Sequence, residues 1–492
     1  MRSRPSGAGQ WILTANGYCS AVLLSLIAAL LMAATSLPFG WSGLFVIPLA
    51  LLFYSWTQGG TRRGRLLRAL LSGTLYFALD LIWLPLSFAK LFGPFGVVPF
   101  VFLWVLEGAF WAALLWVVEL LQPAGPRKVW LLALGWVLLE WLKFLGPLAF
   151  PWAVVGGTLL PTPLIQVISL GGPLLASLLV TLMAAALVRA AQGAPAALGA
   201  MLLIWVAGLL YGALRPAPRG KLHTATLIQG NINPLRKVAG DGSALARYRA
   251  LSRGAPRGLL VWPETAINLF QVQDLPGRPT ISGVATFHHN QALAWNGKAV
   301  TSRYDKIKPV PFGESFPLIH TFPGIYRAVF AALGLPMLHS IEAGRRAVPL
   351  TLGGTLYGTY ICYDSDFPWI SRMMVRRGAE VLINISNDAW FGVGLGMQQE
   401  FAQGRLRAIE DDRYLLRDGN NGITALVGPR GRVDSELPIG VPGRLVVRYR
   451  KLRGITPYVR YGDLPVLAAV LLGILLLQLW PKGRLPADSA GR

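Results

Sequence analysis

Three side chains from separate segments supply the groups that an acyl-transfer site needs: the thiol of Cys362, the carboxylate of Glu264 and the ammonium of Lys306. A free thiol has a pKa of about 8.5, so a carboxylate that accepts its proton makes it a better nucleophile at neutral pH. Attack on an acyl carbonyl places negative charge on oxygen, which a fixed cation and a backbone N–H stabilise. We therefore expect Glu264 to act as the base, and Lys306 with the amide of Tyr363 to hold the oxyanion.

Each of these residues also has a structural explanation when it is considered alone. A cysteine at the end of an apolar strand is usually an inert core residue. Cys19, the only other cysteine, is expected to be such a packing residue, because it lies in an apolar helix without charged neighbours. Lys308 is an alternative to Lys306, and the spacing to Glu314 favours Lys306.

Four longer motifs sharpen the interpretation. They are WPET at residues 262–265, VPFGE at 310–314, SNDAWFG at 386–392 and NNGIT at 420–424. The chain order Glu, Lys, Cys resembles the nitrilase or carbon–nitrogen hydrolase superfamily, and the four motifs together are similar to those of the apolipoprotein N-acyltransferase family. The resemblance covers roughly the whole chain, because this family carries a multi-helix membrane region before its catalytic domain and one helix after it.

The resemblance implies further site residues around Glu264, Lys306 and Cys362. Glu314 resembles a second functional glutamate, and aromatic residues of the family line the site. The supporting and substrate-binding set that follows is Glu314, Tyr363, Asp364, Asn387 and Trp390. The chain departs from the family pattern at Asp364, where glutamate is frequent, and at Val238, where a tryptophan is expected. The segment between Glu264 and Lys306 is also shorter than is usual, which implies a reduced lid.

The composition predicts a membrane protein with a water-soluble part between two apolar parts. Hydrophobic residues make up 53% of the 492, and charged residues only 14%. Apolar runs long enough to span a bilayer predict about eight helices. They lie at residues 11–33, 37–57, 66–88, 95–120, 128–146, 163–188, 197–214 and 464–480. The first run is expected to be a retained anchor, because it is longer than the apolar part of a signal peptide.

The predicted organisation therefore has three regions. Residues 1–214 form a transmembrane region of about seven helices, 215–460 a catalytic domain, and 461–492 a C-terminal transmembrane helix with a short cytoplasmic tail. The resemblance implies that the catalytic domain is a nitrilase-like α-β-β-α sandwich, while the residue pattern alone predicts mixed α and β structure. Strand-like runs lie near 224–231, 258–263, 280–287, 291–297, 347–362, 379–386, 423–428 and 444–449, and residues 400–414 have the pattern of an amphipathic helix.

Basic residues between the apolar runs predict the orientation. Loops rich in lysine and arginine stay in the cytoplasm. The residues that mark such loops are Arg2, Arg4, Arg62, Arg63, Arg65, Arg68, Arg127, Lys128 and Arg189. Seven crossings then place the catalytic domain on the outer, periplasmic side of the bacterial inner membrane. Asp80, Glu107, Glu140 and Lys143 lie inside apolar runs and are expected to face the bundle interior and pair.

The net charge of +23 has two explanations, a nucleic-acid partner or anionic lipid headgroups. The predicted topology favours lipid, and the sequence contains no nucleic-acid-binding motif. Five histidines without HExxH spacing and two cysteines do not make a zinc site. The glycines at 392–396 lack the context of a dinucleotide fingerprint. We expect neither a metal nor another cofactor.

The resemblance implies a two-step reaction with two lipid substrates. A phospholipid donates an acyl chain to Cys362, and the acceptor is the α-amine of the N-terminal diacylglyceryl-cysteine of an apolipoprotein. Two alternatives remain: a membrane-anchored amidase or nitrilase acting on a small C–N substrate, and a transporter whose outward domain binds a ligand. The apolar residues 316–337 are expected to form a mobile arm on the bilayer surface, with ordinary core as the alternative.

Overall fold

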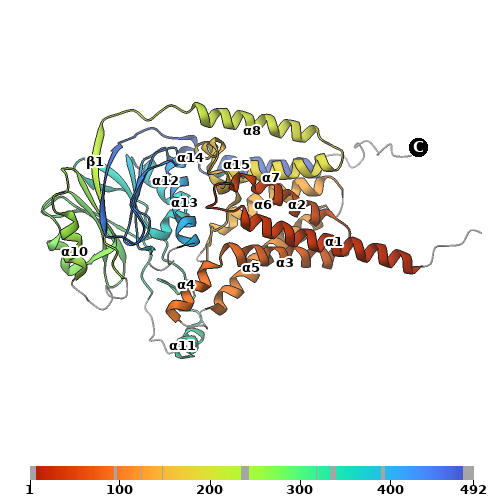
Figure 1. The fold of residues 1–492 in the computed structure, drawn as a ribbon, viewed down its shortest axis with the longest axis horizontal. Helices are drawn as coiled ribbons and strands as arrows, with labels where there is room; N and C mark the ends of the chain where they lie inside the picture. The colour runs from red at the N-terminus through yellow and green to blue at the C-terminus, as the bar shows by residue number, and fades with distance from the viewer. Residues whose placement is uncertain are drawn as a thin grey trace, which may run out of the picture.

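The computed structural model describes residues 7–92, 97–122, 125–146, 148–233, 243–316, 318–332, 340–388 and 394–479. The chain has two parts, a bundle of helices and a β-rich domain at one end of it (Figure 1). The segments before and after the β-rich domain both belong to the bundle. Val238 and Trp390 lie outside the described residues.

Each of the eight apolar runs predicted from the sequence contains helix. The bundle helices are α1 Gly7–Ala34, α2 Val46–Thr57, α3 Arg62–Asp80, α4 Trp83–Phe92, α5 Val98–Leu121, α6 Arg127–Lys143, α7 Ile168–Ala191, α8 Ala196–Leu214 and α15 Leu464–Leu479. Within the described part, three helical segments are long and apolar enough to cross a bilayer, Val98–Leu121, Pro163–Ala191 and Ala196–Leu214. The pair α3 and α4, bent by 56°, adds a fourth if it is counted as one span. The eight crossings therefore stay a prediction.

The ionisable residues inside the bundle are buried and paired, as expected. Lys143 donates to Glu107 across 3.1 Å, and Glu140 accepts hydrogen bonds from the backbone of Val155 and the hydroxyl of Ser177. Asp80 accepts a 2.6 Å hydrogen bond from Ser36. These contacts remove polar groups from the apolar surface of the bundle.

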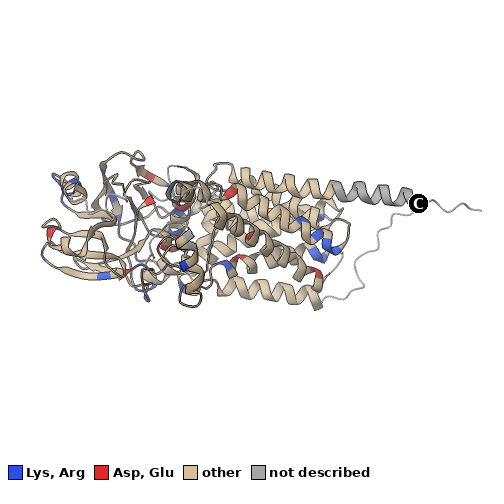
Figure 2. Cartoon of the chain, turned by 90° about the horizontal axis from the view of Figure 1, so that it is seen from below, with Lys and Arg blue, Asp and Glu red and all other residues tan. Residues whose placement is uncertain are grey.

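Charged side chains are distributed unevenly along the bundle. Figure 2 shows basic residues gathered at the end of the bundle farthest from the β-rich domain. There Glu119 forms ion pairs with Arg65 and Lys128 at 2.5 Å and 2.7 Å. This is the end that the sequence predicts to be cytoplasmic.

The β-rich domain contains two six-stranded sheets. The first has the order β12-β1-β2-β3-β4-β5 and the second β11-β10-β9-β8-β7-β6. The strands of the first are β1 Leu222–Gln229, β2 Leu259–Asn268, β3 Thr280–Ala285, β4 Asn290–Trp295, β5 Val300–Asp305 and β12 Gly443–Arg450. Those of the second are β6 Leu350–Leu352, β7 Thr355–Ile361, β8 Val381–Ser386, β9 Leu415–Gly419, β10 Ala425–Val427 and β11 Val433–Glu436.

A layer of helix covers the outer face of each sheet. Helix α10 (Ser243–Ser252) packs on β1 and β2, and helices α12 (Pro368–Arg376) and α13 (Leu395–Asp411) pack on β7 and β9. This order of layers is the predicted α-β-β-α sandwich. Helix α13 also contacts α7, so this outer layer lies between the sheets and the bundle (Figure 1).

The two connections to the bundle leave the β-rich domain side by side. Strands β1 and β12 pair antiparallel from Leu222 opposite Arg450 to Gln229 opposite Gly443. Strand β1 follows α8, and β12 leads through α14 (Pro457–Tyr461) to α15. Helix α15 completes a small core in the bundle, made of Leu134, Val137, Leu174, Val466 and Val470.

The strand arrangement places several strand ends at one edge. Strands β1, β2 and β3 are parallel to one another, as are β7, β8 and β9. Strand β4 runs antiparallel to β3, and β5 antiparallel to β4. The edge therefore carries the ends of β2, β3, β5, β7 and β8 together with the start of β4.

Candidate active site

Cys362 lies where β7 ends and a short 3-10 helix, η6 (Cys362–Asp366), begins. Its backbone has a φ of 47°, in the left-handed region that non-glycine residues seldom adopt. Its side chain is buried, with the residue 4% exposed. Asp364 holds this turn by accepting a 3.2 Å hydrogen bond from the amide of Ile361.

Glu264 sits in an irregular part of β2 opposite β3. The β2–β3 pairing shifts register between Trp262 and Ile267. A Cβ on Gly283 of β3 would lie 2.6 Å from the Cα of Glu264, so only glycine leaves room for this bulge. Bulges re-aim side chains and are frequent beside active sites.

A buried cluster of charges surrounds Glu264. Lys306 donates to Glu264 Oε1 at 3.0 Å and to Glu314 Oε2 at 2.7 Å. The amide of Asn290, the first residue of β4, donates to the same two carboxylates at 2.6 Å and 3.0 Å. The backbone N–H of Asn387 donates to Glu264 Oε2 at 2.8 Å. Glu264 is thus fixed through both of its oxygens.

Asp364 ties the Cys362 turn to the segment that carries the lysine. Its carboxylate accepts hydrogen bonds from the hydroxyl of Tyr304 at 2.7 Å and from the amide of Lys308 at 2.8 Å. The ammonium of Lys308 lies 4.5 Å above the ring of Phe367. Lys306, and not Lys308, is therefore the lysine that contacts Glu264.

The other predicted residues take different positions. The hydroxyl of Tyr363 donates to the carbonyl of Ala149 at 3.1 Å, so this side chain faces the bundle. The side chain of Asn387 accepts a 3.0 Å hydrogen bond from Asn420 of the NNGIT motif. Trp390 is outside the described residues, so its predicted place in the site stays an expectation.

Burial and charge decide the proton affinities of the site. Burial first, and the Glu264 carboxylate next, raise the pKa of Cys362 well above its ordinary value, although Lys306 opposes the shift. Burial also raises the pKa of Glu264, against the opposing effect of Lys306. Burial lowers the pKa of Lys306, but Glu264 and Glu314 outweigh it and hold that pKa well above normal. The resting thiol is therefore protonated beside a permanent cation and a carboxylate able to take a proton.

A second buried charge cluster lies behind Cys362. The guanidinium of Arg417 contacts Asp388 and Glu400 at 3.0 Å each and donates to Asn384 at 2.6 Å. Asn384 in turn donates to the carbonyl of Cys362 at 3.5 Å. Asp388 adjoins Asn387, so this cluster supports both the cysteine turn and the backbone N–H that binds Glu264.

The sequence analysis did not assign five of these contact residues to the site: Asn290, Tyr304, Asn384, Glu400 and Arg417. Asn290 begins β4 at the edge where the strands that carry the motifs end. Its position in the sheet is the feature by which it could have been assigned to the site. Arg417 lies in β9, which was not predicted as a strand because its sequence LLRDG places charges in a fully buried segment. Within the described residues, no group of three metal-ligating side chains is present.

The fold and the buried charges define a domain of the carbon–nitrogen hydrolase type joined to a helical bundle. The family model for carbon–nitrogen hydrolases matches residues 275–446, and the model for the N-terminal domain of apolipoprotein N-acyltransferase matches residues 28–186. The chain belongs to the apolipoprotein N-acyltransferase family, because relatives of that name are similar to it over most of their lengths.

Two of these relatives illustrate the similarity. The apolipoprotein N-acyltransferase of Azotobacter vinelandii is 32% identical, over 93% of this chain and 95% of its own. That of Pseudomonas paraeruginosa is 31% identical, over 92% and 94% respectively. Among solved structures, Saccharomyces cerevisiae Nit3 of the nitrilase superfamily is 15% identical with a TM-score of 0.33, over 55% of this chain and 100% of that one.

Proposed function

We propose that this protein transfers an acyl chain from a phospholipid to the α-amine of the N-terminal diacylglyceryl-cysteine of apolipoproteins, through a thioester on Cys362. The observation that carries the proposal is the buried contact of Lys306 with Glu264 at the edge where β7 ends in the buried Cys362. Membership of the apolipoprotein N-acyltransferase family supplies the two substrates. The three residues form a Glu-Lys-Cys triad in this proposal.

The first half-reaction forms the thioester. Glu264 accepts the proton of Cys362 as the sulfur attacks the ester carbonyl of the phospholipid. Lys306 and the amide of Tyr363 stabilise the charge that develops on the carbonyl oxygen. The C–O bond then breaks, and the oxygen of the departing lysophospholipid takes the proton from Glu264.

The second half-reaction forms the amide. The neutral α-amine of the acceptor attacks the thioester carbonyl, and Glu264 removes a proton from the nitrogen. The C–S bond breaks, and the proton passes from Glu264 to the sulfur of Cys362. The site is then ready for another phospholipid, so the kinetics are of the ping-pong type.

The supporting residues have separate roles in this scheme. Glu314 and Asn387 hold Lys306 and Glu264, and Asp364 fixes the Cys362 turn against the lysine segment. Tyr363 and Trp390 contribute aromatic surface for the lipid substrates. None of these steps requires a metal, another cofactor or a nucleic acid.

In this proposal the bundle is a multi-pass region with about eight crossings of the bacterial inner membrane. Helix α1 begins, and helix α15 ends, at the end of the bundle farthest from the β-rich domain (Figure 1). The basic residues gather at the same end (Figure 2). An arrangement with that end in the cytoplasm supports a catalytic domain on the periplasmic side, where it meets its acceptor at the membrane surface.

The two alternative functions are less well supported. An amidase or nitrilase that acts on a small C–N compound would use the same triad, and a transporter would use the bundle. The relatives that match nearly the whole chain carry the acyltransferase name instead.

Mass spectrometry of the protein after proteolytic digestion tests the proposal. Incubation of the purified protein with a phospholipid should add the mass of one acyl chain to the peptide that contains Cys362. The adduct should disappear on addition of a diacylated lipopeptide with a free α-amine, but not of one whose amine is acetylated. Absence of any acyl adduct on Cys362 in active protein would refute the covalent route.

A further inference from the structure

Gln399 of α13 is buried between the β-rich domain and the bundle. Its Oε1 accepts hydrogen bonds from the indole N–H groups of Trp83 and Trp152, at 2.8 Å each. Its Nε2 donates to the side chain of Asp80 at 3.2 Å and to the carbonyl of Leu37 at 3.3 Å. Because an indole N–H can only donate, these contacts fix the orientation of the amide.

The bundle partners of Gln399 meet where the bundle changes direction. Asp80 ends α3 and Trp83 begins α4, and the two helices are bent by 56° at this break. The rings of Trp83 and Trp152 lie 5.4 Å apart. A Cβ on Gly396 would lie 2.3 Å from the ring of Trp83, so the first turn of α13 lies directly against α4.

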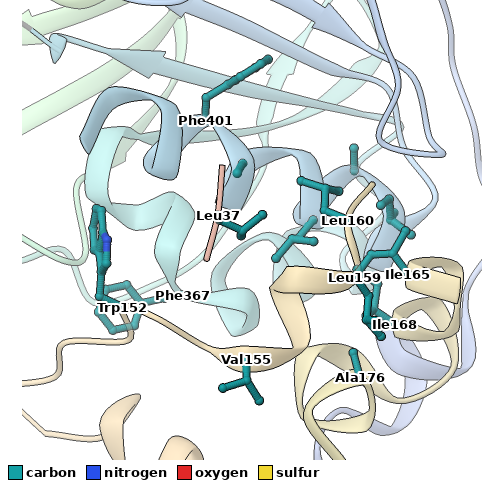
Figure 3. Packing of buried hydrophobic residues seen from close by; sticks show 14 of the residues in the cluster. Leu37, Trp152, Val155, Leu159, Leu160, Ile165, Ile168, Ala176, Phe367 and Phe401 are labelled. Atoms are coloured by element: carbon teal, nitrogen blue, oxygen red, sulfur yellow. The ribbon is translucent and has the colours of Figure 1, made fainter. Parts of the chain in front are cut away.

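The surroundings of this junction are closely packed. Leu37 and Trp152 of the bundle belong to one apolar cluster with Phe367 and Phe401 of the β-rich domain (Figure 3). Phe367 comes shortly after Cys362 in the chain, and Phe401 shortly after Gln399. The remaining cavity has a volume of about 20 Å³ and is lined by Asp80, Trp152, Gln399 and Gln403, among others. This space holds about one water molecule.

A short series of polar contacts connects α13 with the backbone of Cys362. Glu400, the neighbour of Gln399, contacts Arg417 at 3.0 Å. Arg417 binds Asn384, which donates to the carbonyl of Cys362. A shift of α13 relative to α4 therefore moves the support of the nucleophile as well as the wall of the junction.

We propose that Gln399 is a positioning residue for the acylation step. Its hydrogen bonds fix α13 against the bend between α3 and α4, and so align Cys362 with the bundle surface from which the acyl donor arrives. This role rests on the proposed function and deepens it, because it makes the rate of acylation by the phospholipid depend on a contact outside the triad. Gln399 itself does not touch the reacting atoms.

Gln399→Leu tests the role. The substitution keeps similar volume but removes the acceptor of the Trp83 and Trp152 indole N–H groups and the amide donor to Asp80, which keeps its hydrogen bond from Ser36. Thioester formation from a phospholipid in nanodiscs should slow by about tenfold or more, whereas alkylation of Cys362 by iodoacetamide should stay within about twofold of the wild-type rate. A merely structural loss would change the alkylation rate as well, because loosening the fold exposes the buried thiol, and would overturn the proposal.

Gln403→Leu is the matched control. Gln403 lies one turn further along α13 and lines the same cavity, but it has no hydrogen bond to the bundle among the described residues. Its substitution should leave thioester formation near the wild-type rate. An equal loss in the Gln403→Leu and Gln399→Leu variants would show that the hydrogen bonds of Gln399 have no special role.

A charge swap gives a second, independent test. Gln399→Glu keeps the acceptor for both indoles but places a carboxylate against Asp80, so acylation should again slow by about tenfold. Adding Asp80→Asn supplies an amide donor to the new carboxylate and an acceptor for Ser36, and should recover most of the lost rate. A double variant no faster than Gln399→Glu alone would overturn the proposal.

The two proposals fail in different ways. If the wild-type protein forms no acyl adduct on Cys362, the acyltransferase mechanism itself is wrong. If the wild-type protein forms the adduct and the Gln399 variants form it at the same rate, only the positioning role is wrong.

Discussion

Lys306 and Glu264 form a fully buried ion pair, with Nζ of the lysine 3.0 Å from Oε1 of the glutamate. The pair is not isolated, because Glu314 contacts the same ammonium at 2.7 Å. One cation between two carboxylates lets one of the carboxylates gain a proton without leaving the lysine unpaired. In the proposed mechanism, this relationship lets Glu264 act as a base and remain in place during the reaction.

Replacing Cys362 tests the nucleophile. Cys362→Ala and Cys362→Ser should both reduce acyl transfer to background, because neither supplies a thiolate. The change in size is small and the described cysteine is not in a disulfide, so the melting temperature should change little. Transfer of a radiolabelled acyl chain to a lipopeptide measures the effect. Normal transfer by the Cys362→Ala variant would end the thioester mechanism.

Replacing Glu264 tests the base. Glu264→Gln should slow both half-reactions by about 10²–10⁴-fold, because each requires proton transfer through the same carboxylate. Rapid quenching separates the two steps, with thioester formation measured in the absence of acceptor. Thioester formation at the wild-type rate in this variant would assign the base elsewhere.

Replacing Lys306 tests the stabiliser of the oxyanion. Lys306→Met should lower the rate of acylation by about 10²–10³-fold, as the loss of an oxyanion contact does in other acyl-transfer enzymes. Lys308→Met is the matched control, because its ammonium lies over the ring of Phe367 and away from Glu264. A near-normal rate for Lys306→Met with a large loss for Lys308→Met would reverse the choice of lysine.

Asp364 should make the stability of the protein depend on pH. Burial raises the pKa of this carboxyl to about 6, against the opposing effect of Lys306. Between its ordinary value of 3.8 and about 6, the native protein binds a proton that the unfolded chain does not. The contribution of Asp364 to the free energy of unfolding therefore falls as the pH rises through this window and is constant above it.

The Asp364→Asn variant checks this dependence. It lacks the titrating group, so the difference in melting temperature between the two proteins should change between about pH 4 and 6 and level off above that. A difference that is the same at every pH would show that Asp364 does not titrate in this window.

The segment around α11 should respond to the presence of lipid. Helix α11 (Pro323–Ala332) lies apart from the sheets and near α4 (Figure 1). Ile325 is 62% exposed, and Leu318 and Phe322 are also exposed. Apolar side chains of this kind favour the bilayer interface. Backbone amides at 318–332 should exchange hydrogen quickly in detergent and slowly in lipid nanodiscs. Strong protection in both media would indicate that the segment is core.

The sequence grouped Glu264, Lys306 and Cys362 correctly in space because their motifs lie at the ends of strands that meet at one edge. Glu264 and Cys362 each come after an apolar run, and parallel pairing brings such strand ends together, whereas Lys306 reaches the same edge through the antiparallel strands β4 and β5. Asn290 was missed because a single asparagine after a turn has no spacing by which to recognise it. The contact with Glu264 that gives Asn290 its place depends on the register of β3 and β4.

Gln399 shows a different limit of sequence analysis. Its two indole partners lie 316 and 247 residues away in the chain, and neither periodicity nor motif connects them. The pattern of apolar residues does not fix the number of membrane crossings either. It marks where the helices lie, but not whether α2 or α15 is long enough to span a bilayer.

The side-by-side exit of β1 and β12 makes the β-rich domain an insertion into a helical protein. Leu222 is paired with Arg450, so the bundle would need only a short bridge if the domain were absent. During synthesis, however, helix α15 emerges from the ribosome only after the whole inserted domain. The core that Val466 and Val470 share with Leu134, Val137 and Leu174 must therefore stay incomplete until then. The order of synthesis thus makes the α15 contact with α6 and α7 the last step in completing the bundle.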